Sequence, residues 1–143
     1  GALGAGVYRV EVAAEEPVVT AVWTTTGFGE GDDFSWHTAP SVISVPSLVA
    51  VAAGPSPVLA ISNEGEDEAV VTLSGVSGEA VSDVRVAPGT TARVPVEDAS
   101  VYRLRADGGV VRANVTYRGP GALAGYDVLP ADAAAEPVVV YPQ

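Results

Sequence analysis

The sequence predicts an all-β protein, an antiparallel β-sandwich of about a dozen short strands with little or no helix. Many short segments alternate apolar and polar residues, which is the period of a half-buried strand. The apolar residues are largely Val and Ala, and Val favours a pleated, half-buried surface. The 11 prolines and 16 glycines are spread along the chain and leave few places for a long helix.

The alternation is clearest in the last third of the chain. Apolar side chains alternate with arginines in residues 101–106 and with polar side chains in residues 111–118. Between these segments, Asp107-Gly108-Gly109 predicts a type I′ hairpin turn, because Asp-Gly tolerates positive φ. The side chains expected to face inward are Tyr102, Leu104, Ala106, Val111, Ala113, Val115 and Tyr117.

The beginning of the chain carries a similar pattern. Residues 7–12 alternate and predict a strand. Pro17 would open the next strand, where no ladder N–H is needed. The side chains expected to face inward are Tyr8, Val10, Val12, Val19, Ala21 and Trp23.

The middle third predicts four more strands, at residues 57–62, 69–75, 80–87 and 91–97. A polar turn, NEGEDE, follows the first of them. Pro88-Gly89 fits the two central positions of a type II turn. Pro95 lies inside the last strand, which argues for a sheet edge or a bulge.

The early and late patterns match each other as a repeat. The phrase VYRVEV near the start returns as VYRLRA in the last third, so residues 7–53 and 101–141 resemble two copies of a four-strand unit. Two interpretations stay open. Residues 1–53 are a half-repeat that completes the main sandwich of residues 54–143, or they are the tail of a preceding repeat.

The charge and composition limit the partners. The formal net charge is −11 at pH 7, so a nucleic-acid partner is not expected, and an anionic membrane surface is disfavoured. The most apolar window, residues 42–62, is interrupted by Pro and Gly, so we expect no direct membrane insertion. The absence of Cys excludes disulfides and thiolate metal sites.

Catalysis is not expected. His37 is the only histidine, and Asp33 and Ser35 lie beside it on one extended segment. On a strand, successive members of this set would be about 7 Å apart, too far for a hydrogen-bonded relay. One histidine without cysteine also argues against a tetrahedral zinc site. We therefore predict that the protein is not an enzyme.

Two acidic clusters have the oxygen ligands that calcium prefers. The first contains Glu30, Asp32 and Asp33, and the second spans residues 63–68. Neither has the spacing of an EF-hand loop. We favour solvated turns and no cofactor, with calcium as the alternative.

The stretch GFGEGDDFSWH, residues 27–37, holds both phenylalanines, one of the two tryptophans and the only histidine. Aromatic rings on a loop stack on sugar rings or anchor a protein partner. The candidate ligand-binding residues are Phe28, Phe34, Trp36, His37 and Tyr126. We favour the alternative that Phe34 and Trp36 pack inward, as counterparts of Ala124 and Tyr126, and that only Phe28 is exposed.

The order of strands and turns from residue 57 onward resembles β-sandwich repeats of secreted bacterial proteins, which implies an immunoglobulin-like or related sandwich. The stretches PVLAISNEGEDEAVVTLSG, VAPGTTARVPV and VYRLRADGGVVRANVTY carry the resemblance. The closing GALAGYDVLPADAAAEPVVVYP is similar to the C-terminal region of an actinobacterial secreted or cell-envelope family of unknown function. The resemblance implies a bacterial, extracytoplasmic location and transfers no catalytic residue.

We therefore expect a non-catalytic, extracytoplasmic β-sandwich module, excised from a larger envelope or secreted protein. Its expected role is structural, scaffolding or ligand display. A carbohydrate-binding module and a protein–protein interaction domain are the two alternatives. The expected partners are a cell-wall polysaccharide or another envelope protein.

Overall fold

The computed structural model describes residues 8–131, and in these residues it contains ten strands and no helix. The strands are β1 (Ala21–Thr25), β2 (Phe34–Thr38), β3 (Ser47–Val51), β4 (Val58–Asn63), β5 (Ala69–Gly75), β6 (Ala80–Val86), β7 (Thr91–Pro95), β8 (Ser100–Asp107), β9 (Val111–Gly119) and β10 (Ala122–Asp127). The part of the chain described here accordingly has no helix that could span a membrane.

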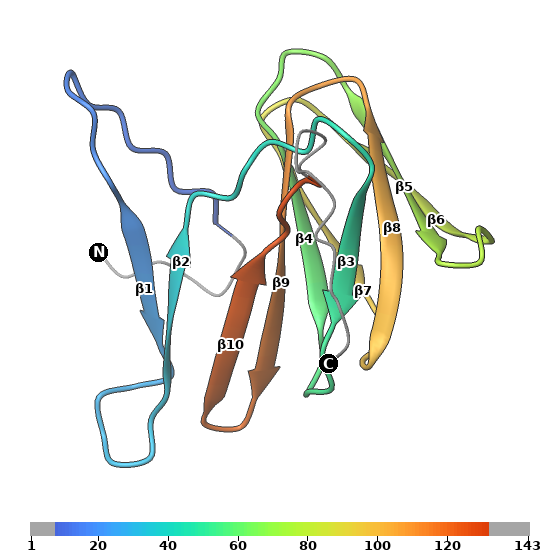
Figure 1. Ribbon diagram of the computed structural model, residues 1–143. Coiled ribbons are helices and arrows are strands. Elements are labelled where there is room, and N and C mark those ends of the chain that lie inside the picture. Colours follow the sequence, from blue (N-terminus) through green and yellow to red (C-terminus); the bar gives the residue numbers. More distant parts are fainter. Residues whose placement is uncertain (1–7, 132–143) are drawn as a thin grey trace, which may run out of the picture.

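The strands form three sheets. Two four-stranded sheets, with orders β10-β9-β4-β7 and β3-β8-β5-β6, make a sandwich of four strands on four (Figure 1). The third sheet is the hairpin β1–β2, which stands beside β10 (Figure 1). Every strand pair is antiparallel, so the predicted antiparallel β-sandwich is confirmed.

The core lies between the two four-stranded sheets. Leu59 and Ile61 of β4 are fully buried, and Leu73 and Leu104 reach the same core from the opposite sheet. Most of the other core side chains are valines, which pack well on a pleated surface. The alternation predicted for β8 and β9 is confirmed, because their expected inward side chains are buried or, for Ala106, partly buried against the core.

The predicted hairpin between β8 and β9 is wrong. Gly108 and Gly109 do adopt positive φ, as the Asp-Gly pattern predicts. However, β8 pairs with β3 and β5, whereas β9 pairs with β4 and β10, so the turn carries the chain from one sheet to the other. A local turn signal does not say which partner each strand takes.

Two proline predictions are confirmed. The N–H of Thr90 donates to the Ala87 carbonyl at 3.2 Å across Pro88-Gly89, and Gly89 has a φ of 68°, as a type II turn requires. Pro95 ends β7, and β7 is an edge strand of its sheet. Its missing N–H therefore leaves no gap in the interior of the sheet.

The predictions for the N-terminal segment are wrong. Residues 8–20 contain no strand, and Tyr8, Val10 and Val12 are exposed. Val19, before β1, is exposed as well. Trp23 is exposed because β1 belongs to the separate hairpin rather than to a layer of the sandwich. Alternation gives the two faces of a strand, but it does not say whether a second layer covers either face.

The segment expected to be a half-repeat, residues 1–53, contributes to two sheets. β3 pairs with β8 inside the sandwich, whereas β1 and β2 pair with each other. The end of the expected second copy, beyond residue 131, lies outside the described residues. The division into domains at residues 53 and 54 stays a prediction.

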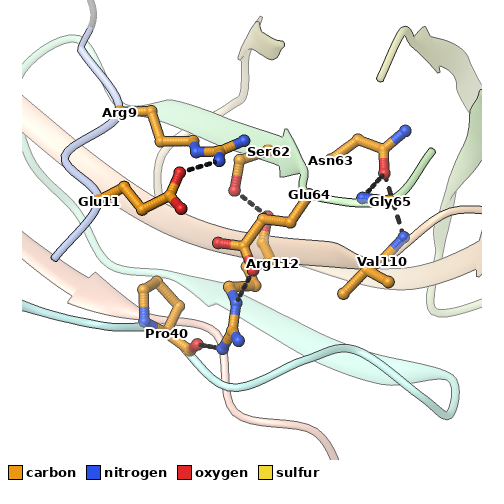
Figure 2. A network of polar contacts seen from close by, with 9 residues as sticks. All are labelled: Arg9, Glu11, Pro40, Ser62, Asn63, Glu64, Gly65, Val110 and Arg112. Atoms are coloured by element: carbon orange, nitrogen blue, oxygen red, sulfur yellow. Dashed lines mark hydrogen bonds and ion pairs between the residues drawn. The ribbon is translucent and has the colours of Figure 1, made fainter. Parts of the chain in front are cut away.

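A fully buried asparagine closes one end of the sandwich. The amide nitrogen of Asn63 donates to the carbonyls of Asp67 at 2.7 Å and Val86 at 3.0 Å. Its amide oxygen accepts from the N–H groups of Gly65 at 2.9 Å and Val110 at 3.1 Å (Figure 2). One side chain thus joins the connections β4–β5 and β8–β9 and the end of β6, with all its hydrogen-bonding capacity used.

Two neighbouring residues support this end. A Cβ on Gly109 would lie 2.5 Å from the Asn63 amide oxygen, so only glycine fits beside it. On the outer face, the Arg112 guanidinium donates to the Glu64 carboxylate at 2.8 Å and to the Pro40 carbonyl (Figure 2). Arg112 thereby holds the segment between β2 and β3 against β9.

Candidate ligand-binding face

The hairpin β1–β2 places three large aromatic side chains on one of its faces. Trp23 of β1 lies directly opposite Trp36 of β2, and Thr25 lies opposite Phe34. Because residues two apart on a strand share a face, Trp23, Phe34 and Trp36 point to the same side. The loop between the strands adds Phe28, whose ring centroid lies 5.7 Å from that of Trp23. We call these four side chains the aromatic face.

All four rings are accessible. The exposed fractions are 44% for Trp23, 89% for Phe28, 56% for Phe34 and 61% for Trp36. The expectation that Phe34 and Trp36 pack inward is therefore wrong. Their hairpin is not a layer of the sandwich, so within residues 8–131 no sheet lies opposite the face that carries them.

Trp23 is the member of this face that the sequence interpretation missed, because its alternation pattern was assigned to the core. The signal that could have identified it is hairpin register. A loop centred on residues 29–30 pairs position 23 with position 36. This register brings the two tryptophans together, with centroids 6.4 Å apart and rings tilted by 39°.

The loop that carries Phe28 is held by Asp32. The carboxylate of Asp32 accepts from the Gly29 N–H at 2.6 Å and from the Thr26 hydroxyl at 3.1 Å. A Cβ on Gly27 would lie 2.4 Å from the same carboxylate, so the loop folds closely around it. Asp32 therefore organises the loop on which Phe28 is displayed.

Asp33 fastens the hairpin to the sandwich. One carboxylate oxygen accepts from the Phe34 N–H, and the other accepts from the N–H of Leu123 in β10, each at 2.8 Å. The Leu123 bond is the main cause that lowers the pKa of Asp33, and the Phe34 bond lowers it further, because both favour the charged form. Asp33 thus acts as an anchor rather than as a ligand displayed to solvent.

Two further contacts join β2 to β10. The Thr38 hydroxyl donates to the Asp127 carboxylate at 2.6 Å. His37 lies against Gly125, where a Cβ would be 2.9 Å from the imidazole Cε1. Because β1–β2 is a separate sheet, side chains rather than a backbone ladder hold these two strands together in the described structure.

His37 is not placed on the aromatic face. It occupies the opposite face of the hairpin with Ser35, and its Nε2 lies 3.4 Å from the Thr24 hydroxyl. Among the described residues, no hydrogen bond links Asp33, Ser35 and His37 to one another. The three residues therefore do not form a relay.

The candidate calcium ligands do not converge. Asp32 and Asp33 point their carboxylates at backbone N–H groups, and Glu30 forms no hydrogen bond with either of them. In the second cluster, Asn63 is committed to the closed end of the sandwich. Within residues 8–131, no group of three or more His, Cys, Asp or Glu side chains is arranged to hold a metal ion.

Tyr126 lies apart from the aromatic face. It is opposite Val115 of β9, on the inner side of its sheet, and its ring centroid is 6.3 Å from that of Tyr117. The Tyr126 hydroxyl donates to the carbonyl of Ala50 in β3, and the Tyr117 hydroxyl donates to the Ala52 carbonyl at 3.2 Å.

These two tyrosines therefore cap the outer edge of β3 and close one side of the sandwich. Burial raises the pKa of Tyr126, and the neighbouring Tyr117 raises it further. The neutral hydroxyl is thus kept in the state that can donate to the Ala50 carbonyl.

In comparisons with known proteins, no family model, no curated protein and no solved structure matches this chain.

Proposed function

We propose that this chain is a non-catalytic ligand-display module of a secreted or cell-envelope bacterial protein. The sandwich is the support, and the aromatic face is the binding surface. The observation that carries the proposal is the exposure of Trp23, Phe28, Phe34 and Trp36 on one side of a single hairpin.

Such a cluster contributes little to the stability of the fold. Aromatic side chains stabilise a protein when they are removed from water, and these four keep between 44% and 89% of their surface exposed. A contiguous group of exposed aromatic rings on a soluble protein marks an interaction site. Large rigid rings also bind with a small loss of conformational entropy, which makes them good anchors.

The polar groups of the hairpin hold the aromatic face in place, and they are not arranged for catalysis. Asp32 and Asp33 use their carboxylates to shape the loop and fasten it to β10. His37 faces Gly125 on the other side of the hairpin. The extracytoplasmic setting rests on the resemblance to secreted bacterial repeats alone, and it belongs to the proposal.

A second candidate is docking of another envelope protein by strand addition. The observation that favours it is the free edge of β1, which pairs with β2 alone among the described strands. An unpaired edge offers N–H and C=O groups to an incoming strand.

The test of ligand display is co-sedimentation with purified bacterial cell walls. We expect the wild-type chain to pellet and the double variant Phe28→Ala/Trp36→Ala to stay in the supernatant. The matched control is Leu48→Ala, which removes an exposed apolar side chain from β3 on the sandwich. Circular dichroism would show that all variants keep the fold.

Pelleting of wild type and control, but not of the double variant, supports the proposal. Equal pelleting of all three would show that the aromatic face is not the binding surface. If none pellets and a defined envelope protein instead pairs with the β1 edge, the second candidate replaces the first.

A further inference from the structure

We propose that the ligand of the aromatic face is an uncharged polysaccharide, whose sugar rings stack on the exposed aromatic rings. This inference rests on the proposed function, because it names the class of ligand that the same face displays. It follows from the charge around the face, from the commitment of the nearby carboxylates, and from the arrangement of the rings.

The charge around the aromatic face disfavours an anionic ligand. From Ala21 to Thr38 the chain contains no Lys or Arg, whereas the loop carries Glu30, Asp32 and Asp33. The formal net charge of the whole chain is −11 at pH 7. A polyanion approaching this face meets repulsion and finds no Lys or Arg within the hairpin itself to pair with.

A cationic ligand is not favoured either. The Asp32 and Asp33 carboxylates already accept hydrogen bonds from the loop and from Leu123. In the described structure Glu30 is the one carboxylate of this loop without a hydrogen bond or ion pair. A single exposed carboxylate contributes little to binding a cation.

The rings offer several separate contact surfaces. Trp23 is tilted by 39° to Trp36 and by 56° to Phe28, so the rings do not stack flat on one another. Each of the four side chains keeps at least 44% of its surface exposed, which leaves room for contact with a ligand. The C–H face of a sugar is apolar, and stacking on aromatic faces requires no charge.

A polymer uses such a row of rings better than a single small ligand. When one sugar ring is bound, the next unit of the chain is held near the next aromatic ring, so further contacts form at a high effective concentration. Phe28 on the loop and Trp36 on β2 are both contact points of this kind. Removal of either ring should therefore weaken binding strongly.

The chain provides its own spectroscopic probe, because its only two tryptophans are Trp23 and Trp36. Their fluorescence can be titrated with two matched pairs of soluble polymers. Hydroxyethyl cellulose and dextran are uncharged, and carboxymethyl cellulose and dextran sulfate carry the same backbones with negative charges. We expect a saturable change with at least one uncharged polymer and binding about tenfold weaker, or none, with its anionic counterpart at low salt.

Two variants test the assignment. Phe28→Ala keeps both tryptophans and should weaken binding of the uncharged polymer about tenfold or more, which corresponds to 1.4 kcal/mol per factor of ten. Leu48→Ala should bind as the wild type does. Added salt should reduce the difference in affinity between the anionic and the uncharged polymers, because salt screens the repulsion between the anionic polymer and the acidic chain.

The outcomes separate this inference from the function on which it rests. If an anionic polymer binds as well as or better than its uncharged partner, or if no uncharged polymer binds although cell walls still pellet the wild type, the ligand class is wrong and ligand display stands. If the wild-type chain also fails to pellet with cell walls, both the ligand class and the proposed ligand display are contradicted. A wild-type dimer that becomes a monomer in Phe28→Ala would make a second copy the occupant and overturn the polysaccharide.

Discussion

Asn63 and the aromatic face differ in an unexpected way, because the polar side chain is buried and the apolar rings are exposed. At the closed end of the sandwich, a polar amide is fully buried and makes four hydrogen bonds. On the hairpin, four aromatic rings lie exposed to solvent. The difference shows that a side chain in this protein is buried where the fold supplies groups to contact it, whether the side chain is polar or apolar. Asn63 finds donors and acceptors in two connections and at the end of β6, whereas among the described strands no sheet lies opposite the rings.

The largest expected effect is at the buried amide. Asn63→Ala leaves the N–H groups of Gly65 and Val110, and two carbonyls, without their partner. Each buried unsatisfied group costs about 1–3 kcal/mol, so we expect the free energy of unfolding to fall by about 3 kcal/mol or more. Urea denaturation measures the change.

The control for this variant is Glu66→Ala, an exposed residue of the same turn, which should change stability by about 0.5 kcal/mol or less. A loss below about 1 kcal/mol for Asn63→Ala would contradict the view that this amide holds the end of the sandwich closed.

The second prediction compares an aliphatic residue of the core with a ring of the aromatic face. Leu59→Ala removes a fully buried side chain and should cost about 2–5 kcal/mol of stability. Phe28→Ala removes a ring that is 89% exposed and should cost about 0.5 kcal/mol or less. Thermal denaturation measures both. A large loss in Phe28→Ala would mean that the ring supports the fold and would weaken its role as a displayed contact.

The third prediction separates Tyr126 from the aromatic face. Tyr126→Phe removes the hydroxyl that donates to the Ala50 carbonyl and should cost about 1 kcal/mol. The edge of β3 is then less protected, so self-association measured by size-exclusion chromatography should rise. Polysaccharide binding should stay as in the wild type, and a loss of binding with intact fold would return Tyr126 to the site.

The smallest effect is expected at the anchor Asp33. Its pKa is lowered in the folded protein, so its stabilising contribution is complete above the ordinary aspartate pKa of about 3.9. The contribution is lost as the pH falls through the lowered pKa. We expect tryptophan emission to change in this acidic range as the hairpin loosens from β10.

Asp33→Asn provides the comparison for this titration, because an amide does not ionise in the acidic range. The difference between the two emission curves isolates Asp33 from the other carboxylates of the chain. Identical curves would show that the Leu123 contact does not hold the hairpin.

The sequence predicted the parts of the fold that depend on local pattern. The faces of β8 and β9, the Pro88-Gly89 turn and the edge position of Pro95 all follow from side-chain period and from proline chemistry. The pairing of strands cannot be predicted from local pattern. Asp107-Gly108-Gly109 is a typical hairpin-turn sequence, and yet it connects strands of two different sheets.

The candidate site shows the same limit. Phe28, Phe34 and Trp36 could be selected from composition, but their exposure depends on whether a second layer covers the hairpin. Trp23 was missed because its strand was expected to face the core, although its register in the hairpin places it opposite Trp36. Tyr126 was selected although it lies opposite Val115, on the inner side of its sheet. Composition marked the region, and only the pairing shows which rings share a surface.

The side-chain attachment of β2 to β10 has a consequence for how this protein can diversify. The residues that fasten the hairpin, Asp33, His37 and Thr38, differ from the four that form the aromatic face. Substitutions at the exposed positions can therefore change what is bound while the hairpin keeps its place. Selection, or a designer, can alter recognition here without rebuilding the scaffold.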